Sequence, residues 1–433
     1  MRLGGVRLGV MSSLIRALGG LLACAAEPAG ADGILRDSFG AISSGRAGAS
    51  IAMADSGAVM IDNPAAMLHL PASGLFEIRV DSYIIDIKYS DPENSAGGPF
   101  APAVIPEFTW VRRSADDRWA VGFSVFSPGG FSSEYRMDAP VIGESKYESS
   151  LEFLKAMPGL AVRLSDHWSF GVAFGVAYSR VQLEAPLFRQ TGPDSGLPTF
   201  MDLDADGWGL SGGLSLHYES GAPGERRRLG LSYTHGTHIS LDGETRARIF
   251  GAAPSPIQSE FDTKLEIDFP RSLGVGVAQE FGRGLVSFDV VVTDWSSAFD
   301  DIPLRLTNGS ASSLNGQTFR DRFPLDWKDG ITFRFGFEYA LDANRIVRAG
   351  YAYHPNPVPR DTMTPLIPTV LEHIFTIGYS VRRGDWTWGL AAEFAGGNSV
   401  SVENSRIAGG EFDRSRLDGA GFGFFLSATY SFE

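Results

Sequence analysis

The chain is short of cysteine, of basic residues and of long apolar runs, and each shortage excludes a class of protein. Cys24 is the one cysteine among 433 residues, so the chain forms neither an internal disulfide framework nor a cysteine-based metal site. With 37 Lys and Arg against 51 Asp and Glu, the net charge of -14 argues against nucleic acid as a partner. After position 30, no apolar run of about 18 residues occurs, which excludes helical membrane spans. A membrane β-barrel stays compatible with this, because its strands alternate in polarity and average to a neutral hydropathy.

The first residues have the layout of a secretory signal. A basic start is followed by an apolar core over 17–26 and an A-x-A cleavage site at Ala29–Ala31. We therefore predict that residues 1–31 are a cleaved signal peptide, with Met1 or Met11 as the start. The alternative is a lipoprotein signal at Leu21–Cys24, in which Cys24 carries the lipid. In either case the chain leaves the cytoplasm.

A two-residue alternation of polarity runs through most of the remaining chain. In Ile331–Ala340, large apolar side chains share one face, and small or polar side chains share the other. Such a period with one apolar face predicts a β-strand. The same pattern recurs at Trp168–Tyr178, Trp208–Tyr218, Leu229–Tyr233, Trp386–Phe394 and Phe424–Phe432.

Two features place the apolar faces against lipid rather than in a soluble core. Gly, Ala and Ser dominate the opposite faces, where a solvated sheet would carry Lys, Glu and Thr. Aromatic residues gather at strand ends, as in the girdles of outer-membrane barrels: Trp119, Trp168, Trp208, Tyr218, Trp386 and Tyr430. Long links, among them 131–150, 186–204 and 296–327, also alternate with short polar turns at 114–116, 165–166, 220–225, 281–284, 341–344 and 382–385. We therefore predict an all-β fold, a transmembrane antiparallel β-barrel of about 14 strands in the outer membrane of a Gram-negative cell.

Residues 32–72 have no strand pattern and are rich in Gly, Ala and Ser. A barrel of the predicted size cannot fill its bore with its own side chains, so it either conducts water or holds a plug. We predict that residues 32–72 form a hatch inside the lumen and that residues 73–433 form the barrel.

An ordered set of motifs resembles the FadL/TodX outer-membrane transporters of long-chain fatty acids and aromatic hydrocarbons. The motifs are Gly45–Gly48, Asn63–Met67, Trp119–Gly122, Thr293–Ser296, Arg348–Tyr353, Pro357–Pro359 and Pro365–Pro368. The resemblance covers essentially the whole mature length. It implies a fourteen-stranded barrel with an internal hatch and passive, energy-independent uptake of hydrophobic molecules. The ligand would land on an outer apolar groove, pass to an inner pocket, and leave sideways into the outer leaflet when the hatch shifts.

Two backbone features are candidates for gating. Asn63, Pro64 and Ala65 match the hatch motif of the family, and they also suit a rigid bend that leads into the first strand. Pro128, Gly129 and Gly130 interrupt the third predicted strand, because proline donates no ladder hydrogen bond. The resemblance implies an inward kink there that opens the wall, and an ordinary start to an outer loop is the alternative.

Ligand contacts are predicted from apolar and basic side chains near these features. Flexible methionines and aromatic rings suit hydrophobic ligands of varied shape, and the candidates are Met53, Met60, Ile61, Met67, Phe126 and Phe131. Arg334 and Arg348 lie on small-residue faces, where either could hold a carboxylate. Glu338, Asp289 and Glu393 share these faces, so we favour a lumenal charge network for the arginines.

The remaining predictions concern partners and competing functions. Apolar residues in 131–150 and 186–204, such as Phe131 and Leu187, either form an interaction surface or pack against one another. A general porin for polar solutes is a competing function, and a barrel esterase built on His238 and Ser240 is another. We expect no catalytic residues, cofactor or metal, and we interpret the histidines as structural. The expected partners are a fatty acid or hydrocarbon ligand, outer-membrane lipid and lipopolysaccharide, with the chain a monomer.

Overall fold

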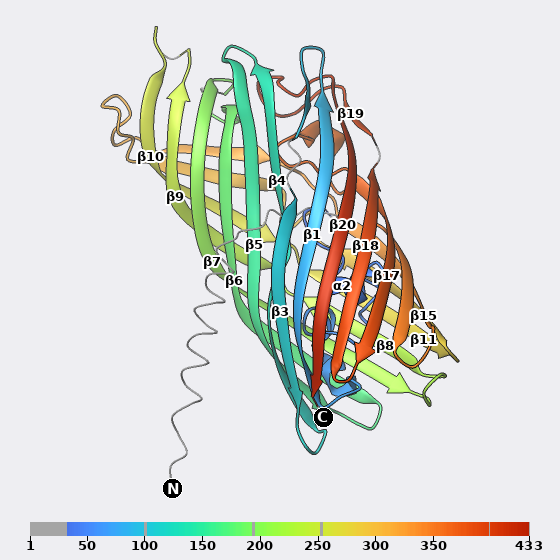
Figure 1. Cartoon of the computed structure of the whole chain (residues 1–433). Helices are drawn as coiled ribbons and strands as arrows, with labels where there is room; N and C mark the ends of the chain where they lie inside the picture. Colours follow the sequence, from blue (N-terminus) through green and yellow to red (C-terminus); the bar gives the residue numbers. More distant parts are fainter. Residues whose placement is uncertain (1–32, 99–101, 193–194, 252–253, 398, 433) are drawn as a thin grey trace.

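The computed structural model describes residues 33–98, 102–192, 195–251, 254–397 and 399–432, so the predicted signal peptide lies outside the described residues. A closed antiparallel barrel makes up most of them (Figure 1). Its first strands are β1 (Gly74–Ser90), β2 (Ser95–Gly97), β3 (Ala103–Arg113), β4 (Trp119–Ala139), β5 (Gly143–Arg163), β6 (Trp168–Phe188), β7 (Pro198–Ser220), β8 (Arg227–Thr234), β9 (Thr237–Ile249) and β10 (Ile257–Phe269). The others are β11 (Ser272–Phe281), β12 (Gly284–Thr293), β13 (Asp301–Thr307), β14 (Phe319–Pro324), β15 (Gly330–Ala340), β16 (Arg345–Tyr353), β17 (Leu371–Arg383), β18 (Trp386–Gly397), β19 (Val400–Val402) and β20 (Ser415–Phe432).

These strands occupy fourteen positions in the wall, as predicted. Four positions hold two consecutive strands each, because β8 and β9, β10 and β11, β12 and β13, and β14 and β15 are separated by short breaks. The short strands β2 and β19 lie in the connecting segments. Pairing of β1 with β20, from Gly74 opposite Phe432 to Ser90 opposite Arg416, closes the barrel. The described segments contain no helix that is both long and apolar enough to cross a membrane.

Side chains alternate between the outside and the lumen as predicted. In β15, Ile331, Phe333, Phe335 and Phe337 are exposed on the outer surface, whereas the residues between them are buried. An exposed apolar surface this large is typical of a face that meets lipid. The outer surface becomes charged along β10, where Glu260 to Asp268 alternate outward, which places β10 beyond the apolar band.

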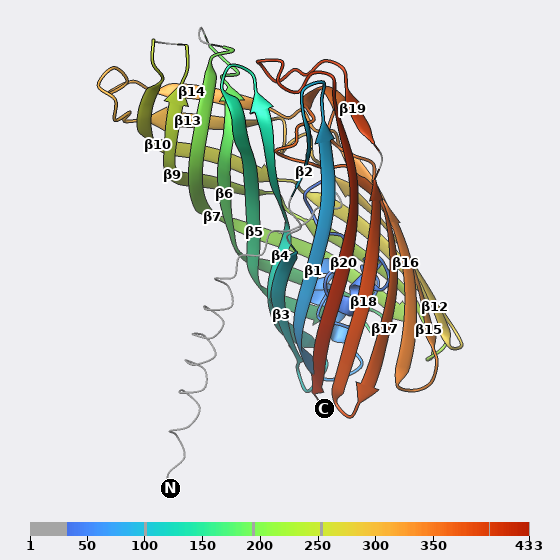
Figure 2. The same ribbon diagram turned by 45° about the horizontal axis from the view of Figure 1, so that its top comes forward.

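The two rims differ in the length of their connections (Figure 2). Turns of a few residues join β3 to β4, β5 to β6, β7 to β8, β11 to β12, β15 to β16 and β17 to β18, at the six places where short turns were predicted. At the other rim, the prediction of a long loop over 131–150 is wrong. These residues extend β4 and β5 as a hairpin with a turn at 140–142. The alternation continues there, but its outward members are charged rather than apolar.

Residues 33–73, the described residues before β1, lie inside the barrel, where they form the hatch (Figures 1 and 2). Its helical pieces are α2 (Gly40–Ser44), α3 (Val59–Asp62) and the 3-10 helix η1 (Pro64–His69), and a further 3-10 helix, η2 (Arg360–Thr362), lies in the β16–β17 connection. Glycines on the lumenal faces of the strands let the backbone of the hatch come close to the wall. A Cβ atom at Gly350 would lie 2.3 Å from the carbonyl carbon of Arg46, and one at Gly171 would lie 2.3 Å from the Ala65 nitrogen. The small residues on the inner faces therefore make room for the hatch.

Candidate functional site

The Asn63–Pro64–Ala65 bend attaches the hatch to the wall. The Asn63 side-chain amide donates to the Leu216 carbonyl of β7 at 3.1 Å and to the hatch carbonyl of Ile51 at 2.7 Å. The Ala65 N–H donates to the Ser215 hydroxyl at 2.9 Å. Because Asn63, Ala65 and Ser215 are buried, the bend fixes one end of the hatch against β7. Whether it gates a passage stays a prediction.

The other end of the hatch is held by buried ion pairs. The Arg36 guanidinium pairs with Glu107 of β3 at 2.6 Å and with Asp81 of β1. It also donates to the backbone carbonyl of Ser127, next to the predicted kink, at 3.0 Å. Burial acts to lower the pKa of Arg36, but Glu107 and the other acidic neighbours raise this pKa well above its ordinary value. Arg36 therefore stays charged.

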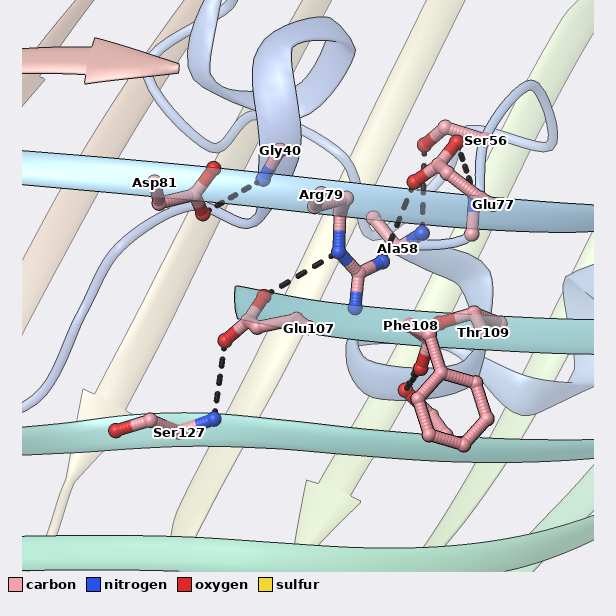
Figure 3. Close-up of polar contacts among 12 residues, drawn as sticks. Gly40, Ser56, Ala58, Glu77, Arg79, Asp81, Glu107, Phe108, Thr109 and Ser127 are labelled. Carbon is pink, nitrogen blue, oxygen red and sulfur yellow. Dashed lines mark hydrogen bonds and ion pairs between the residues drawn. The ribbon is translucent and has the colours of Figure 1, made fainter. Parts of the chain in front are cut away.

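A second arginine extends this cluster along β1. Arg79 lies 3.3 Å from Glu107 and 3.3 Å from Glu77. Figure 3 shows Glu107 between Arg79 and Ser127, whose N–H donates to the carboxylate at 3.0 Å. The same view shows the N–H of Gly40, at the start of α2, which donates to Asp81 at 3.0 Å. The carboxylates of the wall thus hold both the hatch backbone and the kinked strand.

At the predicted kink, β4 loses its regular pairing. Pairing of β3 with β4 ends at Phe108 opposite Val125, although β3 itself continues back to Ala103 beside β1. Between Phe126 and Gly129, the pairing of β4 with β5 shifts register. Gly130 has φ of 141°, which L-amino acids with side chains rarely adopt. Pro128, Gly129 and Gly130 therefore lie at a bulge, beside a stretch where β3 and β4 separate.

The hatch pairs with β4 at this bulge. The Arg36 N–H donates to the Pro128 carbonyl at 2.9 Å, and the Gly130 N–H donates to the Ile34 carbonyl at 2.8 Å. A Cβ atom at Gly129 would lie 2.2 Å from the Ile34 oxygen, so glycine is needed for this approach. The hatch thus occupies the place that a neighbouring strand would otherwise take.

The predicted lumenal charge network is found on the opposite wall. Arg348 pairs with Glu338 at 2.6 Å, and Glu338 also pairs with Arg46 of the hatch. Arg334 pairs with Asp37 of the hatch at 2.9 Å. The two arginines proposed as carboxylate ligands are therefore engaged by acidic side chains.

An inner cavity of about 150 Å³ lies between the hatch and the bulge of β4. It brings together four predicted ligand contacts, namely Met60, Ile61, Phe126 and Arg334, with Pro64 and Pro128 in the same lining. Met53 and Met67 instead pack within the hatch–wall contacts, Met53 beside Leu285 and Met67 beside Val111.

Lys155 and Asp62 are among the ionisable residues of this lining that were not predicted. Lys155 of β5 is buried, and its ammonium lies 5.0 Å from the ring centroid of Phe153. Among the described residues, Lys155 has no ion-pair partner. Its position in the alternating run Leu151, Phe153, Lys155 was the available signal. The other residue is Asp62 of α3, whose pKa is raised to about 7, chiefly by burial.

An outer cavity of about 360 Å³ lies near the rim with long connections, and most of its lining is apolar. It contains Phe131, one of the predicted ligand contacts, with Leu187, Phe188 and Leu197 from the predicted interaction surface. Tyr135 and Met137 pack instead into a buried cluster. Phe131 and Leu187 also pack against this cluster, so the outer cavity borders a buried core.

The esterase alternative lacks its central contact. His238 Nδ1 lies 2.8 Å from the Asp268 carboxylate of β10, on the exposed outer face of β9. Within the described part of the chain, no hydrogen bond joins His238 to Ser240, the contact that would activate a serine nucleophile.

Comparison with known proteins agrees with this architecture. Residues 22–432 match the family described as outer membrane protein transport protein (OMPP1/FadL/TodX). The chain is 23% identical over 419 residues to a long-chain fatty acid transport protein of Escherichia coli O6:H1, covering 88% of this chain and 86% of that one. A FadL homologue of Pseudomonas aeruginosa has a similar structure, with a TM-score of 0.76, 18% identity and coverage of 93% of this chain and 100% of that one. The toluene transporter TodX of P. putida gives a TM-score of 0.75 at 21% identity, covering 92% and 99%. The chain belongs to the OMPP1/FadL/TodX family of outer-membrane transport proteins.

Proposed function

We propose that this protein is a passive channel through which long-chain fatty acids enter the outer membrane. The observation that carries the proposal is the inner cavity, whose lining includes hatch residues, an uncompensated cation and part of the bulge beside which β3 and β4 separate. The route begins in the outer apolar cavity, continues to the inner cavity, and leaves sideways between β3 and β4. Hatch movement at Arg36 and at the Asn63–Pro64–Ala65 bend gates the last step.

Lys155 favours a fatty acid over a hydrocarbon. A buried ammonium without an acidic partner is costly, and a carboxylate at the end of an apolar chain would compensate it. Phe126, Met157 and Phe153 supply apolar contacts beside it in the same cavity. Aromatic hydrocarbon uptake, suggested by the name of the TodX relative, would leave the ammonium unpaired. Uptake of aromatic hydrocarbons by the same route is the alternative function.

The test compares two ligands that differ only in the head group. Oleate and oleyl alcohol compete with a fluorescent fatty acid for the purified channel, and uptake of both is then followed in proteoliposomes. Lys155→Met should weaken oleate binding by roughly 10- to 150-fold, because a hydrogen bond to a charged group contributes about 1.5–3 kcal/mol. Binding of oleyl alcohol should change little, and Lys155→Arg should keep the preference for oleate.

The outcomes separate ligand from route. If Lys155→Met affects oleate and oleyl alcohol equally, carboxylate recognition by Lys155 is wrong, although a hydrophobic channel stands. If the wild-type channel passes neither ligand but releases a polar sugar from liposomes, the protein is a porin and the proposed function fails.

A further inference from the structure

Two histidines and a glutamate meet where the hatch joins the wall, at the rim with short turns. His69 is the last residue of η1, and His217 and Glu219 lie two residues apart on β7. One ligand atom from each side chain lies within 4.8 Å of the others. His69 is distant in sequence from the other two residues, so no spacing motif indicates the cluster.

His217 lacks the partners that a buried imidazole normally has. The residue is 0% exposed, and neither of its ring nitrogens makes a hydrogen bond to any residue that the structure describes. Buried polar atoms without partners are rare in folded proteins. The orphaned nitrogens therefore point to a ligand that occupies this position.

His69 is held in a form suited to metal binding. The Ser169 hydroxyl donates to the Ala65 carbonyl at 2.8 Å, so toward His69 Nε2, at 3.0 Å, it acts as an acceptor. The proton of His69 then lies on Nε2, and its Nδ1 keeps a lone pair. Metal-bound histidines are commonly oriented by such a contact on the second nitrogen. The ring centroids of His69 and His217 are 4.6 Å apart.

Glu219 supplies the anionic ligand. Its carboxylate accepts from Arg228 at 2.7 Å, and Arg228 also pairs with Glu280 at 2.5 Å. Arg226 lies 3.8 Å from the same carboxylate, and when Glu219 turns toward a cation, Glu280 still neutralises Arg228.

We propose that His69, His217 and Glu219 bind a divalent transition-metal ion, and that the ion links the hatch to β7. Two imidazoles and one carboxylate suit Zn²⁺, whose Zn–N bonds of about 2.0–2.1 Å require the ligand atoms to close to about 3.3 Å. The site lies beside the contacts of Asn63 and Ala65 with β7, so the ion reinforces the same attachment. The proposed metal site does not depend on the proposed transport function, because metal binding is measured on the resting channel.

The test uses the full chain in detergent without a polyhistidine tag, stripped of metal and titrated with Zn²⁺ by calorimetry. The wild type should bind one equivalent of Zn²⁺, and Co²⁺ at the site should give the intense visible absorption of a tetrahedral complex. His69→Ala and Glu219→Gln should each weaken Zn²⁺ binding at least tenfold. His235→Ala is the matched control, because this histidine is exposed beside Tyr233 and should leave binding unchanged.

A readout of structure accompanies the titration. Zn²⁺ should slow hydrogen exchange in residues 63–69 of the wild type and leave it unchanged in His69→Ala. Absence of stoichiometric Zn²⁺ binding to the wild type would overturn the site. So would binding that survives both His69→Ala and Glu219→Gln.

Discussion

Replacement of Arg36 by glutamine should release the hatch from the wall while the barrel stays folded. The Arg36 guanidinium is fully buried and compensates both Asp81 and Glu107. Glutamine keeps a hydrogen-bond donor of similar length but removes the charge. Two buried carboxylates are then left near each other with only Arg79 to offset them.

Removal of one partner from a buried ion pair typically costs about 3–5 kcal/mol. Because 1.36 kcal/mol corresponds to a factor of ten, the opening equilibrium of residues 33–48 should rise roughly 150- to 5,000-fold. Hydrogen exchange with mass-spectrometric detection measures this equilibrium directly, since docked hatch amides exchange through local opening. Amides of β15 and β16, on the far wall, should keep their wild-type protection.

Two further variants test the cause. Arg382→Gln, at the exposed end of β17, is the matched control and should leave hatch exchange unchanged. Addition of Asp81→Asn and Glu107→Gln to Arg36→Gln should restore part of the protection, because the stranded carboxylates are then neutral. If Arg36→Gln leaves the hatch as protected as in the wild type, the ion pairs do not hold it and the reasoning is refuted.

Two other predictions concern the hatch and the gap in the wall. The pKa of Asp62 rises from 3.8 to about 7 in the folded protein, so protonation of Asp62 favours the docked hatch. The stability of the docked hatch should therefore fall by about 4 kcal/mol as the pH rises from about 4 through 7. Asp62→Asn should remove this part of the pH dependence of hatch exchange, and equal slopes in both proteins would contradict it. Cysteines at Pro106 and Ser127, joined by a short thiol-reactive reagent, should close the gap between β3 and β4 and stop fatty-acid uptake. The same reagent across cysteines at Arg382 and Thr387, which are already paired, should leave uptake unchanged. Unchanged uptake in the variant with cysteines at Pro106 and Ser127 would refute the lateral route.

The sequence predicts the barrel well, because its two-residue period survives wherever the outer face meets lipid. The prediction fails where the strands pass beyond the membrane. In β7, Met201, Leu203 and Ala205 still face inward, but the outward residues between them are aspartates, so the sequence predicts a loop up to residue 204 where the structure has a strand. A period of two with charged outward residues is the signal that was missed.

The candidate site is less predictable, because its parts meet only in the folded chain. Composition and motif single out Pro128, which lies at the bulge of β4, and Asn63, which attaches the hatch to β7. The small-residue faces that single out Arg334 and Arg348 do not single out Lys155, because Lys155 lies among large apolar side chains. The roles of Arg334 and Arg348 follow from charge pairing, because Asp37 pairs with Arg334 and Glu338 pairs with Arg348.

The hatch supplies the backbone partners that the gap between β3 and β4 lacks. Backbone groups left unpaired at membrane depth are costly, so an open seam between β3 and β4 needs partners from elsewhere. Hatch residues Ile34 and Arg36 supply them to Gly130 and Pro128, and Glu107 accepts from Ser127. Arg36 therefore completes the backbone pairing of the bulge and neutralises the wall carboxylates at the same time. In the gating proposed above, displacement of this one residue would uncover the seam and the inner cavity together, and the polar groups that it leaves behind would be hydrated from the lumen.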